Sequence, residues 1–547
     1  MPPTRPLSTR AYFAAALVLF TLLTAALTYP QITGLRDTVH DDGDPLLNAW
    51  AIAWVAHQLP RAPAHLFDAN IFYPERRTLA YSETLIAPSV AVAPLLWLGA
   101  GPLLVYNIVF LAGFIVSGAG TALLVRELTG SGPAGVLAGI VFAFLPYRID
   151  HYAHLQLQQT EFIPLALWAF HRLLATGRRK DGALLGVFTG AQLLSCMYYG
   201  IFLIPYFGVV CGALLAADRV KARRAAAGLA LAVAIAGVSA VPVGRAYLGA
   251  RKVVGERGVE EIAARSATWR NYLAAPYPSL LYGSTAEKFG EAERRLFPGF
   301  LAMLLAAVAL WPPLSAPRAA YGLGLLVAVD LSLGFNGFAY RFLYDHLLPF
   351  RALRIPARMG VMSGFSLAVL AGFGWLRVAA LARTPRRRRA AWVAIGALML
   401  LEYASKPLDL ATLPTAPPEI YADLLRDRGD APTAIVFEFP ASPKDDPTYM
   451  YWSTFHWQTL VNGYSGFFPS SYIALVSAMQ DFPSDESFRQ MKMHGTRYLL
   501  VHGERLFGAR YEDLVRDLAQ RPELALVSRR PWAHSEISLY RVVYGEK

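Results

Sequence analysis

The sequence is poor in charge and in cysteine. Of its 547 residues only 16% are charged, 55% are hydrophobic and two are cysteines. Soluble proteins of this length are far more polar, so the composition excludes an ordinary soluble enzyme. Cys196 and Cys211 lie in one apolar stretch, where we expect small buried thiols rather than a disulfide or a metal pair.

Motifs of well-known chemistry are also absent. The sequence has no glycine-rich phosphate loop, CxxC pair, HExxH or GxSxG, which removes the usual basis for nucleotide, zinc or serine-hydrolase chemistry. No internal repeat is visible, and the apolar segments are nearly free of charge. A lipid or glycan transporter typically shows repeated halves and charges within its spans. We keep a transporter as an alternative, although the lack of repeated halves and the lack of charges within the spans count against it.

Apolar runs long enough to cross a bilayer recur along the chain. They predict an α-helical polytopic membrane protein with about 11 transmembrane helices. The expected spans are residues 11–29, 103–125, 132–147, 160–176, 182–197, 199–217, 225–248, 299–315, 319–334, 357–381 and 390–406. Residues 84–100 are also apolar, but Pro88 and Pro94 interrupt this short run, which favours a juxtamembrane or re-entrant helix on the outer face.

Basic residues set the expected orientation. By the positive-inside rule the clusters at Arg178–Lys180, Arg219–Arg224 and Arg386–Arg389 belong in the cytoplasm. The same rule places the N-terminus, with Arg5 and Arg10, inside, and no clear cleavage site follows it, so the first run is a retained span. The formal net charge of +12 therefore reflects membrane topology and not a nucleic-acid partner.

The chain divides into two predicted domains. Residues 1–406 form the membrane domain, whose outer loop at 30–100 holds an amphipathic and a juxtamembrane helix. Residues 407–547 contain more acids than bases and form a small α/β domain outside the membrane. Its strand patterns are TAIVFEFP, TRYLLVHG, ELALVSRR and ISLYRVVYG, and its helical patterns are Tyr421–Arg428 and Tyr511–Gln520.

Four acids precede a helical pattern in the outer loop, namely Asp37, Asp41, Asp42 and Asp44. Asp44 occupies the expected N-cap and Pro45 the first helical position. The apolar face of this helix is Leu46, Ala49, Trp50, Ala53, Trp54 and His57. Acids at a membrane boundary can supply a general base or oxygen ligands for a divalent cation. The alternative is that Asp44 only caps the helix and the others are solvated loop residues.

A second candidate segment is HYAHLQLQQTEF, in a turn that the span count places outside. His151 and His154 are three residues apart, so both can face one ligand, either a metal or a phosphate. The alternative is a polar interfacial turn between two spans.

A third segment, FRALRIPARMG, carries Arg351, Arg354 and Arg358 at the mouth of an apolar span. Arginines on the outer face go against the positive-inside bias, and their forks suit phosphate oxygens. Lipid headgroups or Asp345 are the alternative partners. The basic outer loop from Arg245 to Phe297, which includes Arg257, is either a flap over an anionic lipid substrate or a plain solvated loop.

The tail contains an aromatic segment, YMYWSTFHWQTLVNGYSGFFP. Aromatic platforms stack on sugars, which makes Trp452, His456, Trp457 and Tyr464 candidate acceptor-binding residues. Aromatic side chains also build the cores of small domains, and we favour this second interpretation.

The order of these features resembles the GT-C superfamily of integral-membrane glycosyltransferases, which includes bacterial aminoarabinose transferases and protein mannosyltransferases. The resemblance rests on an inside N-terminus, one span, an acidic outer loop before a helix, an outer juxtamembrane helix and a span ending in LLVREL. GDPLLNAWAIAW, the HxxHLQL turn and FRALRIPARMG are similar to an uncharacterised bacterial branch of that superfamily. The resemblance covers about residues 10–405.

This resemblance implies an inverting enzyme in a bacterial-type inner membrane. It would move a hexosyl or pentosyl group from a polyprenyl-phosphate donor to a glycan, lipid or protein acceptor on the outer face. One first-loop acid would act as the base, with Asp44 the first choice and Asp41 and Asp42 next. The superfamily often has Asp-Glu or Asp-x-Asp where this chain has DDGD, so the choice within the cluster stays open.

The same resemblance implies roles for the other two segments. Arg354 and Arg358, together with Arg351, would neutralise the phosphate leaving group. His151 and His154 would bind that phosphate. A divalent cation, Mg or Mn, would have Asp42, Asp44 and His154 as its ligands.

A non-catalytic membrane assembly factor of cell-envelope glycan synthesis is a second alternative. Such a protein would bind its partner through the tail. It would tolerate loss of the first-loop acids, whereas truncation of the tail would abolish its function.

Overall fold

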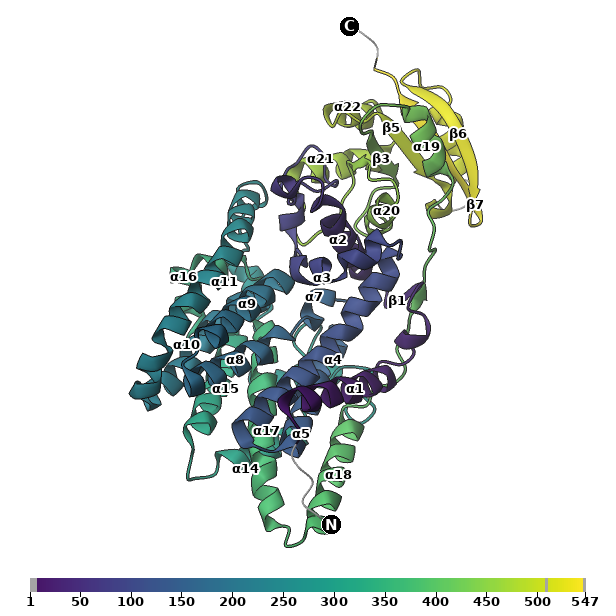
Figure 1. The fold of residues 1–547 in the computed structure, drawn as a ribbon. Helices are drawn as coiled ribbons and strands as arrows, with labels where there is room; N and C mark the ends of the chain where they lie inside the picture. Colours follow the sequence, from purple (N-terminus) through teal and green to yellow (C-terminus); the bar gives the residue numbers. More distant parts are fainter. Residues whose placement is uncertain (1–6, 507–509, 545–547) are drawn as a thin grey trace. The chain divides into compact units, whose positions relative to one another are not determined.

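The computed structural model describes residues 7–506 and 510–544. Arg5 and Gly545, which contribute to the predictions above, lie outside these ranges. The chain is mostly helical, with a small sheet near its C-terminus (Figure 1). Its contacts form two compact units: a helical unit of residues 1–34, 108–242 and 256–410, and a mixed unit of residues 35–107, 243–255 and 411–547. The mixed unit therefore combines the first outer loop with the tail.

The helical unit contains a helix at each predicted span. Its longer helices are α1 (Thr9–Leu27), α4 (Pro102–Thr129), α5 (Gly132–Ala143), α8 (Phe162–Thr176), α9 (Arg179–Ser195), α10 (Met197–Ala217), α11 (Arg219–Val254), α14 (Phe300–Leu310), α15 (Ala316–Ser332), α17 (Gly360–Leu381) and α18 (Pro385–Glu402). The short ones are α6 (Pro146–Asp150), α7 (Leu155–Gln158), α12 (Val259–Ala264), α13 (Thr285–Phe289) and α16 (Tyr340–His346). The first residues of α4 and the last turns of α11 belong to the mixed unit.

Within the described residues, six helices are long and apolar enough to cross a membrane. They are Thr9–Leu27, Pro102–Thr129, Gly132–Asp150, Met197–Ala217, Arg219–Val254 and Pro356–Leu381. The chain is thus a multi-pass membrane protein. The remaining predicted spans are helices too, but each is either too short or not apolar enough to be counted among the six.

Helix α17 packs on α5, α14 and α15, and its label lies beside that of α5 in Figure 1. Its small residues allow close approach: a Cβ on Gly374 would lie 2.0 Å from the carbonyl oxygen of Leu305 on α14. Residues Gly360–Gly372 of α17 are buried throughout. Arg358, in the short η7 segment (Pro356–Met359) directly before α17, is therefore mounted on a rigid element.

The mixed unit begins with a small loop domain. Strand β1 (Thr38–Val39) precedes α2 (Asp44–Gln58), and α3 (Ile86–Trp97) follows. Helix α3 is 12 residues long, which is too short to span a bilayer. Its exposed apolar side chains include Val90, Trp97 and, just beyond it, Leu98, as expected for a helix on the membrane surface.

The tail forms the predicted α/β fold. After β2 (Ala411–Thr412), its sheet has the order β4-β3-β5-β7-β6, with β4 (Thr459–Leu460), β3 (Ile435–Phe439) and β5 (Tyr498–His502) parallel and with β7 (Ser535–Val542) and β6 (Leu524–Trp532) antiparallel. Leu499 of β5 pairs with Tyr540 of β7. The helices are α19 (Ile420–Arg428), α20 (Asp446–Ser453), α21 (Ser470–Ala478), α22 (Asp485–Met493) and α23 (Arg510–Leu518).

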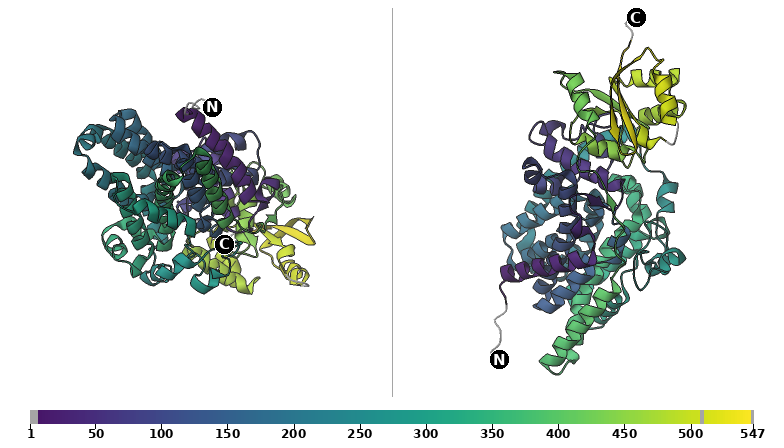
Figure 2. Two further views of the ribbon diagram at one scale, coloured as in Figure 1. Left: turned by 90° about the horizontal axis from the view of Figure 1, so that it is seen from below. Right: turned by 90° about the vertical axis from the view of Figure 1, so that its right-hand side faces the viewer.

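Both faces of this sheet are covered by helices (Figure 2). On one face Phe437, Leu499 and Tyr540 pack with residues of α21, α22 and α23. Helix α19 contacts β6 and β7, and the side chain of Glu438, which alternates with Phe437, accepts a hydrogen bond from Tyr421 of α19. The four strands and two helices predicted for the tail are confirmed, whereas β2, β4, α20, α21 and α22 were not predicted.

Candidate active site

The first-loop acids stand at the beginning of α2. The helix begins at Asp44 and Gly43 is its N-cap, so the predicted N-cap was one residue too late. Asp44 Oδ1 accepts a hydrogen bond from the Tyr464 hydroxyl at 2.8 Å, and these two residues are 420 positions apart in the chain. The Asp44 carboxylate is therefore bound by a side chain of the tail.

Asp41 and Asp42 occupy different environments. Asp41 is half-buried, and its Oδ1 accepts a hydrogen bond from the Gly43 N–H at 2.9 Å. Burial raises the pKa of Asp41 from its ordinary value, and the Gly43 N–H opposes this only in part. A raised pKa suits a general base. Asp42 is exposed to solvent, which disfavours it as the base.

Helix α2 differs from the predicted amphipathic helix because it is buried on all sides from Pro45 to Ala56. It packs on α3 and α20. Trp50 donates its indole N–H to Asn70 Oδ1 at 3.1 Å, and Trp54 donates to the Leu66 carbonyl at 2.9 Å. Because α2 is buried on all sides and both indole N–H groups bond within the protein, the helix is an internal support for Asp44. It is not a helix lying in the lipid interface.

The four predicted acceptor residues divide into two groups. Trp452 and His456 are 2% and 7% exposed and lie in the core of the tail, where Trp452 contacts Tyr421, Tyr449, His502 and Trp532. Their rings do not face solvent, which agrees with the favoured interpretation of this aromatic segment as core, and their role in acceptor binding stays a prediction. Trp457 and Tyr464 are partly exposed. The Trp457 ring stacks on His57 at a centroid distance of 4.0 Å.

In the helical unit three of the predicted phosphate-binding residues meet around one acid, Glu293. Arg358 donates to both oxygens of Glu293, at 3.0 and 2.7 Å. His151 Nε2 lies 2.8 Å from Glu293 Oε2, and His154 Nε2 lies 3.8 Å from Oε1. Burial raises the pKa of Glu293, but Arg358 and His151 outweigh that effect and hold it well below its usual range.

A second part of this group is more open to solvent. Arg354 Nε lies 3.8 Å from Glu261 Oε1, and the Arg257 guanidinium lies 3.4 Å from the same oxygen. The backbone N–H of Arg354 donates to the Tyr198 hydroxyl at 2.9 Å, and Arg358 lies over the Tyr198 ring at 4.9 Å. Tyr198 thus joins the two parts.

We call the resulting group the cationic cluster. It contains three arginines and two histidines but only two glutamates, and its residues are His151, His154, Arg257, Glu261, Glu293, Arg354 and Arg358. An anion is the ligand that this balance of charges favours. Arg354 has 36% of its side chain exposed, against 5% for Arg358, so Arg354 is the arginine better placed to reach a ligand.

Arg351, the third predicted arginine, binds backbone instead. Its Nε donates to the Tyr344 carbonyl at 3.1 Å and its Nη2 to the Asp345 carbonyl at 2.9 Å. The Asp345 carboxylate pairs with Arg341. In this conformation Arg351 therefore orders the turn after α16.

The turn that carries His151 is built around Arg148. Its guanidinium is fully buried and donates to Gln158 Oε1, to the Gln158 carbonyl and to the Ala143 carbonyl. Gln158 in turn donates to the carbonyls of Arg148 and His151. This network fixes the backbone on both sides of His151, so its ring has a defined position.

Sequence reasoning missed Glu293 and Tyr198. Glu293 stands in GEAERR, where it looks like one of several loop charges, and Tyr198 stands in CMYYG at the break between α9 and α10. No spacing connects either residue with His151 or Arg358. Among residues 7–506 and 510–544, no group of three or more His, Cys, Asp or Glu side chains is arranged to hold a metal ion.

No protein-family model and no curated protein matches the chain. A solved structure of the arabinofuranosyltransferase AftD from Mycobacteria is similar over 99% of this chain and 42% of that one, with 14% identity and a TM-score of 0.63. The chain has the GT-C fold. It spans about two fifths of the length of the AftD chain.

Two further structures with the GT-C fold are more distant. The oligosaccharyltransferase AglB from Archaeoglobus fulgidus, in complex with an inhibitory peptide and a dolichol-phosphate, is 14% identical over 90% of this chain and 69% of that one, with a TM-score of 0.43. ArnT from Cupriavidus metallidurans bound to undecaprenyl phosphate is 12% identical over 97% of both chains, with a TM-score of 0.46. The fold inferred from the sequence resemblance is thus confirmed, and the confirmation rests on the first structure.

Proposed function

We propose that this chain is an inverting glycosyltransferase that uses a polyprenyl-phosphate sugar as donor. The observation that carries the proposal is the cationic cluster, because Glu293, only 11% exposed, holds Arg358 and His151 in place while Arg354 has 36% of its side chain exposed. Such a site suits a phosphate that gains negative charge as the sugar leaves. The first-loop acids supply the second requirement, a base for the acceptor hydroxyl.

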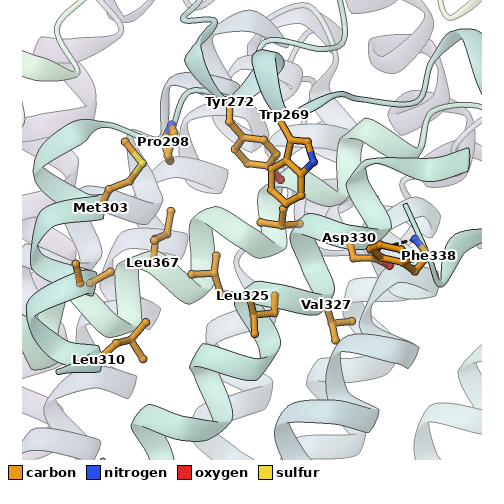
Figure 3. A pocket seen from close by; sticks show the side chains of 14 residues that line it. Trp269, Tyr272, Pro298, Met303, Leu310, Leu325, Val327, Asp330, Phe338 and Leu367 are labelled. Carbon is orange, nitrogen blue, oxygen red and sulfur yellow. Dashed lines mark hydrogen bonds between the residues drawn. The ribbon is translucent and has the colours of Figure 1, made fainter. Parts of the chain in front are cut away.

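An apolar groove in the helical unit supports a lipid donor. It has a volume of 730 Å³ and lies among α14, α15 and α17, with Trp269 and Tyr272 across from Leu310 and Leu325 (Figure 3). Leu367 of α17 lines it, nine residues after Arg358, which corresponds to roughly 13 Å along a helix. A polyprenyl chain whose phosphate binds at the cationic cluster is easily long enough to reach this groove.

The chemistry proposed here is a single displacement. Asp44 removes the proton of the acceptor hydroxyl, the acceptor oxygen bonds to the anomeric carbon, and the bond from that carbon to the phosphate oxygen breaks. The polyprenyl phosphate leaves with the extra charge, which Arg354 and its neighbours stabilise. One displacement inverts the configuration at the anomeric carbon.

A divalent cation is a separate part of the proposal. Magnesium is held in many enzymes by one or two carboxylates, waters and substrate phosphates, so the site needs no preformed cage of protein ligands. Asp42 and Asp44, two of the three predicted ligands, are carboxylates of the kind required. The test is activity after removal of metal with EDTA, followed by addition of magnesium or manganese; unchanged activity after EDTA argues against the cation.

The orientation follows from the positive-inside rule. We propose a bacterial-type inner membrane, with the N-terminus in the cytoplasm and the first loop and tail outside it. Acceptors of three classes, glycan, lipid and protein, fit this location. The donor panel should include a polyprenyl phosphoarabinofuranose, because the similar structure with the higher TM-score is an arabinofuranosyltransferase.

The experiment that tests the function uses the purified full chain in lipid. It is incubated with polyprenyl-phosphate sugars and with nucleotide sugars, each with the three classes of acceptor, and the released polyprenyl phosphate is measured. We expect turnover with at least one lipid-linked donor, a product with inverted anomeric configuration, and a higher donor KM in Arg354→Gln. Turnover with nucleotide sugars alone, or retention of configuration, would refute the proposal.

A further inference from the structure

A segment of the first loop lies along the edge of the tail sheet and is bonded to it through backbone groups. The N–H of Leu460, on edge strand β4, donates to the Asn70 carbonyl at 2.8 Å. The N–H of Phe72 donates to the Asn462 carbonyl and that of Tyr73 to the Leu460 carbonyl, both at 3.0 Å. An unpaired edge strand is a liability, and here the loop covers it. The loop and the tail are therefore joined by backbone pairing.

The Phe72 side chain strengthens this joint. Its ring fills the space where a Cβ of Gly463 would lie, at 2.7 Å, and it contacts Tyr472 and Phe468 of the tail. Phe72 has a φ of 56°, a conformation that is rare for a bulky side chain and persists only where the surroundings enforce it. The next residue after Gly463 is Tyr464.

A second joint lies on the other side of the acids. Strand β1 of the loop pairs with β2 of the tail, with Thr38 opposite Thr412 and Val39 opposite Ala411. The N–H of Leu413 donates to the Asp37 carbonyl at 2.7 Å. The acids Asp41, Asp42 and Asp44 thus lie between two segments that are bonded to the tail. One is β1, before the acids, and the other is the Asn70–Tyr73 segment, after α2.

Between these joints, one tail side chain reaches the acids themselves. The Tyr464 hydroxyl donates to Asp44 Oδ1 at 2.8 Å. Hydrogen bonds to a carboxylate are stronger than neutral ones, and they restrict the rotation of the acceptor group. A base must be held within a narrow range of positions to be effective.

We infer that the tail is part of the active site and that Tyr464 is a positioning residue for the base. This inference rests on the proposed function, because it takes Asp44 as the base. The tail orders the acid segment through the two backbone joints, and the Tyr464 hydroxyl sets the orientation of the Asp44 carboxylate. The tail is therefore required for catalysis as well as for any contact with an acceptor.

The first test is Tyr464→Phe, which removes one oxygen atom. We expect kcat to fall about tenfold or more, because a hydrogen bond to a charged group is lost, while the donor KM changes less than twofold. The matched control is Tyr498→Phe, since Tyr498 donates to Asp427 of the tail at the same distance of 2.8 Å. This control should keep wild-type kcat. Equal kcat in both variants and wild type would overturn the inference.

The second test separates positioning from a general loss of stability. In the Asp44→Asn background, Tyr464→Phe should cause little further loss of kcat, because the group that it positions is already disabled. If the two losses multiply, Tyr464 acts independently of Asp44 and the inference is wrong.

The third test does not need activity. Hydrogen exchange of the full chain should show at least fivefold faster exchange at Leu46 and Leu47 in Tyr464→Phe than in Tyr498→Phe, since both amides bond to Gly43 at the start of α2. Unchanged exchange would overturn the inference even in an active enzyme. Faster exchange in a protein that turns over no polyprenyl-phosphate sugar would support the positioning of Asp44 by Tyr464 but would refute the proposed function.

Discussion

At the scale of single residues, Glu293 determines how the cationic cluster is built. Its carboxylate accepts two hydrogen bonds from Arg358 and lies 2.8 Å from His151 Nε2. These two neighbours hold the pKa of Glu293 well below its usual range. A buried arginine is costly without such a partner. Glu293 therefore fixes the geometry of the cluster, and Arg354 and Arg257 provide its more accessible positive charge.

We expect Glu293→Gln to destabilise the protein by about 3–5 kcal/mol, because the amide leaves the buried Arg358 without a counterion. Thermal unfolding of the full chain in detergent measures the effect. The control is Glu291→Gln, since Glu291 is largely exposed and pairs with Arg294 on the surface. If both variants unfold at the same temperature, Glu293 does not have this structural role.

At the scale of elements, the joint between the first loop and the tail sheet depends on one glycine. A Cβ on Gly463 would lie 2.7 Å from the Phe72 ring, a distance that requires the ring or the strand end to move. Gly463 also directly precedes Tyr464. A small shift at this position therefore reaches the side chain that binds Asp44.

Gly463→Ala should destabilise the mixed unit by about 1–3 kcal/mol, the usual cost of an added group in a packed site, and should lower kcat. Hydrogen exchange at Phe72 and Tyr73 would report the opening of the joint. Gly244→Ala is a suitable control, because nothing lies within 4 Å of the added Cβ. Wild-type exchange in Gly463→Ala would show that the joint tolerates the added methyl group.

The tail also contains buried titratable groups that make its stability depend on pH. Burial lowers the pKa of His502, but hydrogen bonds to Glu438 and Glu504 prevail and raise it to about 9. The charged histidine therefore stabilises the fold below about pH 6.5, its ordinary pKa, and this contribution disappears as the pH rises to about 9. Burial raises the pKa of Asp446 to about 7, so the folded state favours its neutral form and loses stability between about pH 4 and 7.

We expect the free energy of unfolding of the tail to fall as the pH rises from about 5 to 9. His502→Gln should remove the upper part of this decline and Asp446→Asn the lower part. The measurement is hydrogen exchange of β3 and β5 in the full chain, corrected for the intrinsic effect of pH on exchange. A decline that is the same in wild type and in both variants would assign it to other groups.

At the scale of the whole molecule, the topology is the prediction on which the proposed location depends. If the N-terminus lies in the cytoplasm, the tail lies outside it. The cysteine introduced by Met493→Cys in the tail should then react with a membrane-impermeant maleimide in intact cells. A cysteine at Arg387→Cys, in the basic cluster before α18, should react only after the membrane is permeabilised. Cys196 is buried and Cys211 is partly so, which keeps the background low. The reverse pattern of labelling would invert the topology.

The sequence was sufficient for the fold and for part of the site. Apolar periodicity predicted the helices, and strand patterns predicted most of the tail sheet, because these signals are local. The span count also predicted that His151, His154 and Arg358 lie on one side of the membrane. Their common partner Glu293 and the bond from Tyr464 to Asp44 were beyond prediction. Glu293 is 142 positions from His151 and 65 from Arg358, and Tyr464 is 420 positions from Asp44, without any spacing rule.

One local prediction was wrong for a physical reason. The pattern of α2 indicated one apolar face, yet the helix is buried on every side because α3 and α20 of the mixed unit cover it. The aromatic run of the tail fitted either a sugar-binding platform or a core, and Trp452 and His456 lie in the core, as the favoured interpretation expected. A sequence shows which side chains are apolar, but it does not show how many partners will cover them.

The central claim is that Asp44 is the base of a lipid-linked glycosyl transfer, and the most direct measurement is the rate of polyprenyl-phosphate release by Asp44→Asn. The control is Asp68→Asn, an acid of the same loop that pairs with His65. We predict that Asp44→Asn loses about a hundredfold or more of kcat with a nearly unchanged donor KM, whereas Asp68→Asn stays within about threefold of wild type. Wild-type turnover in Asp44→Asn would contradict the account.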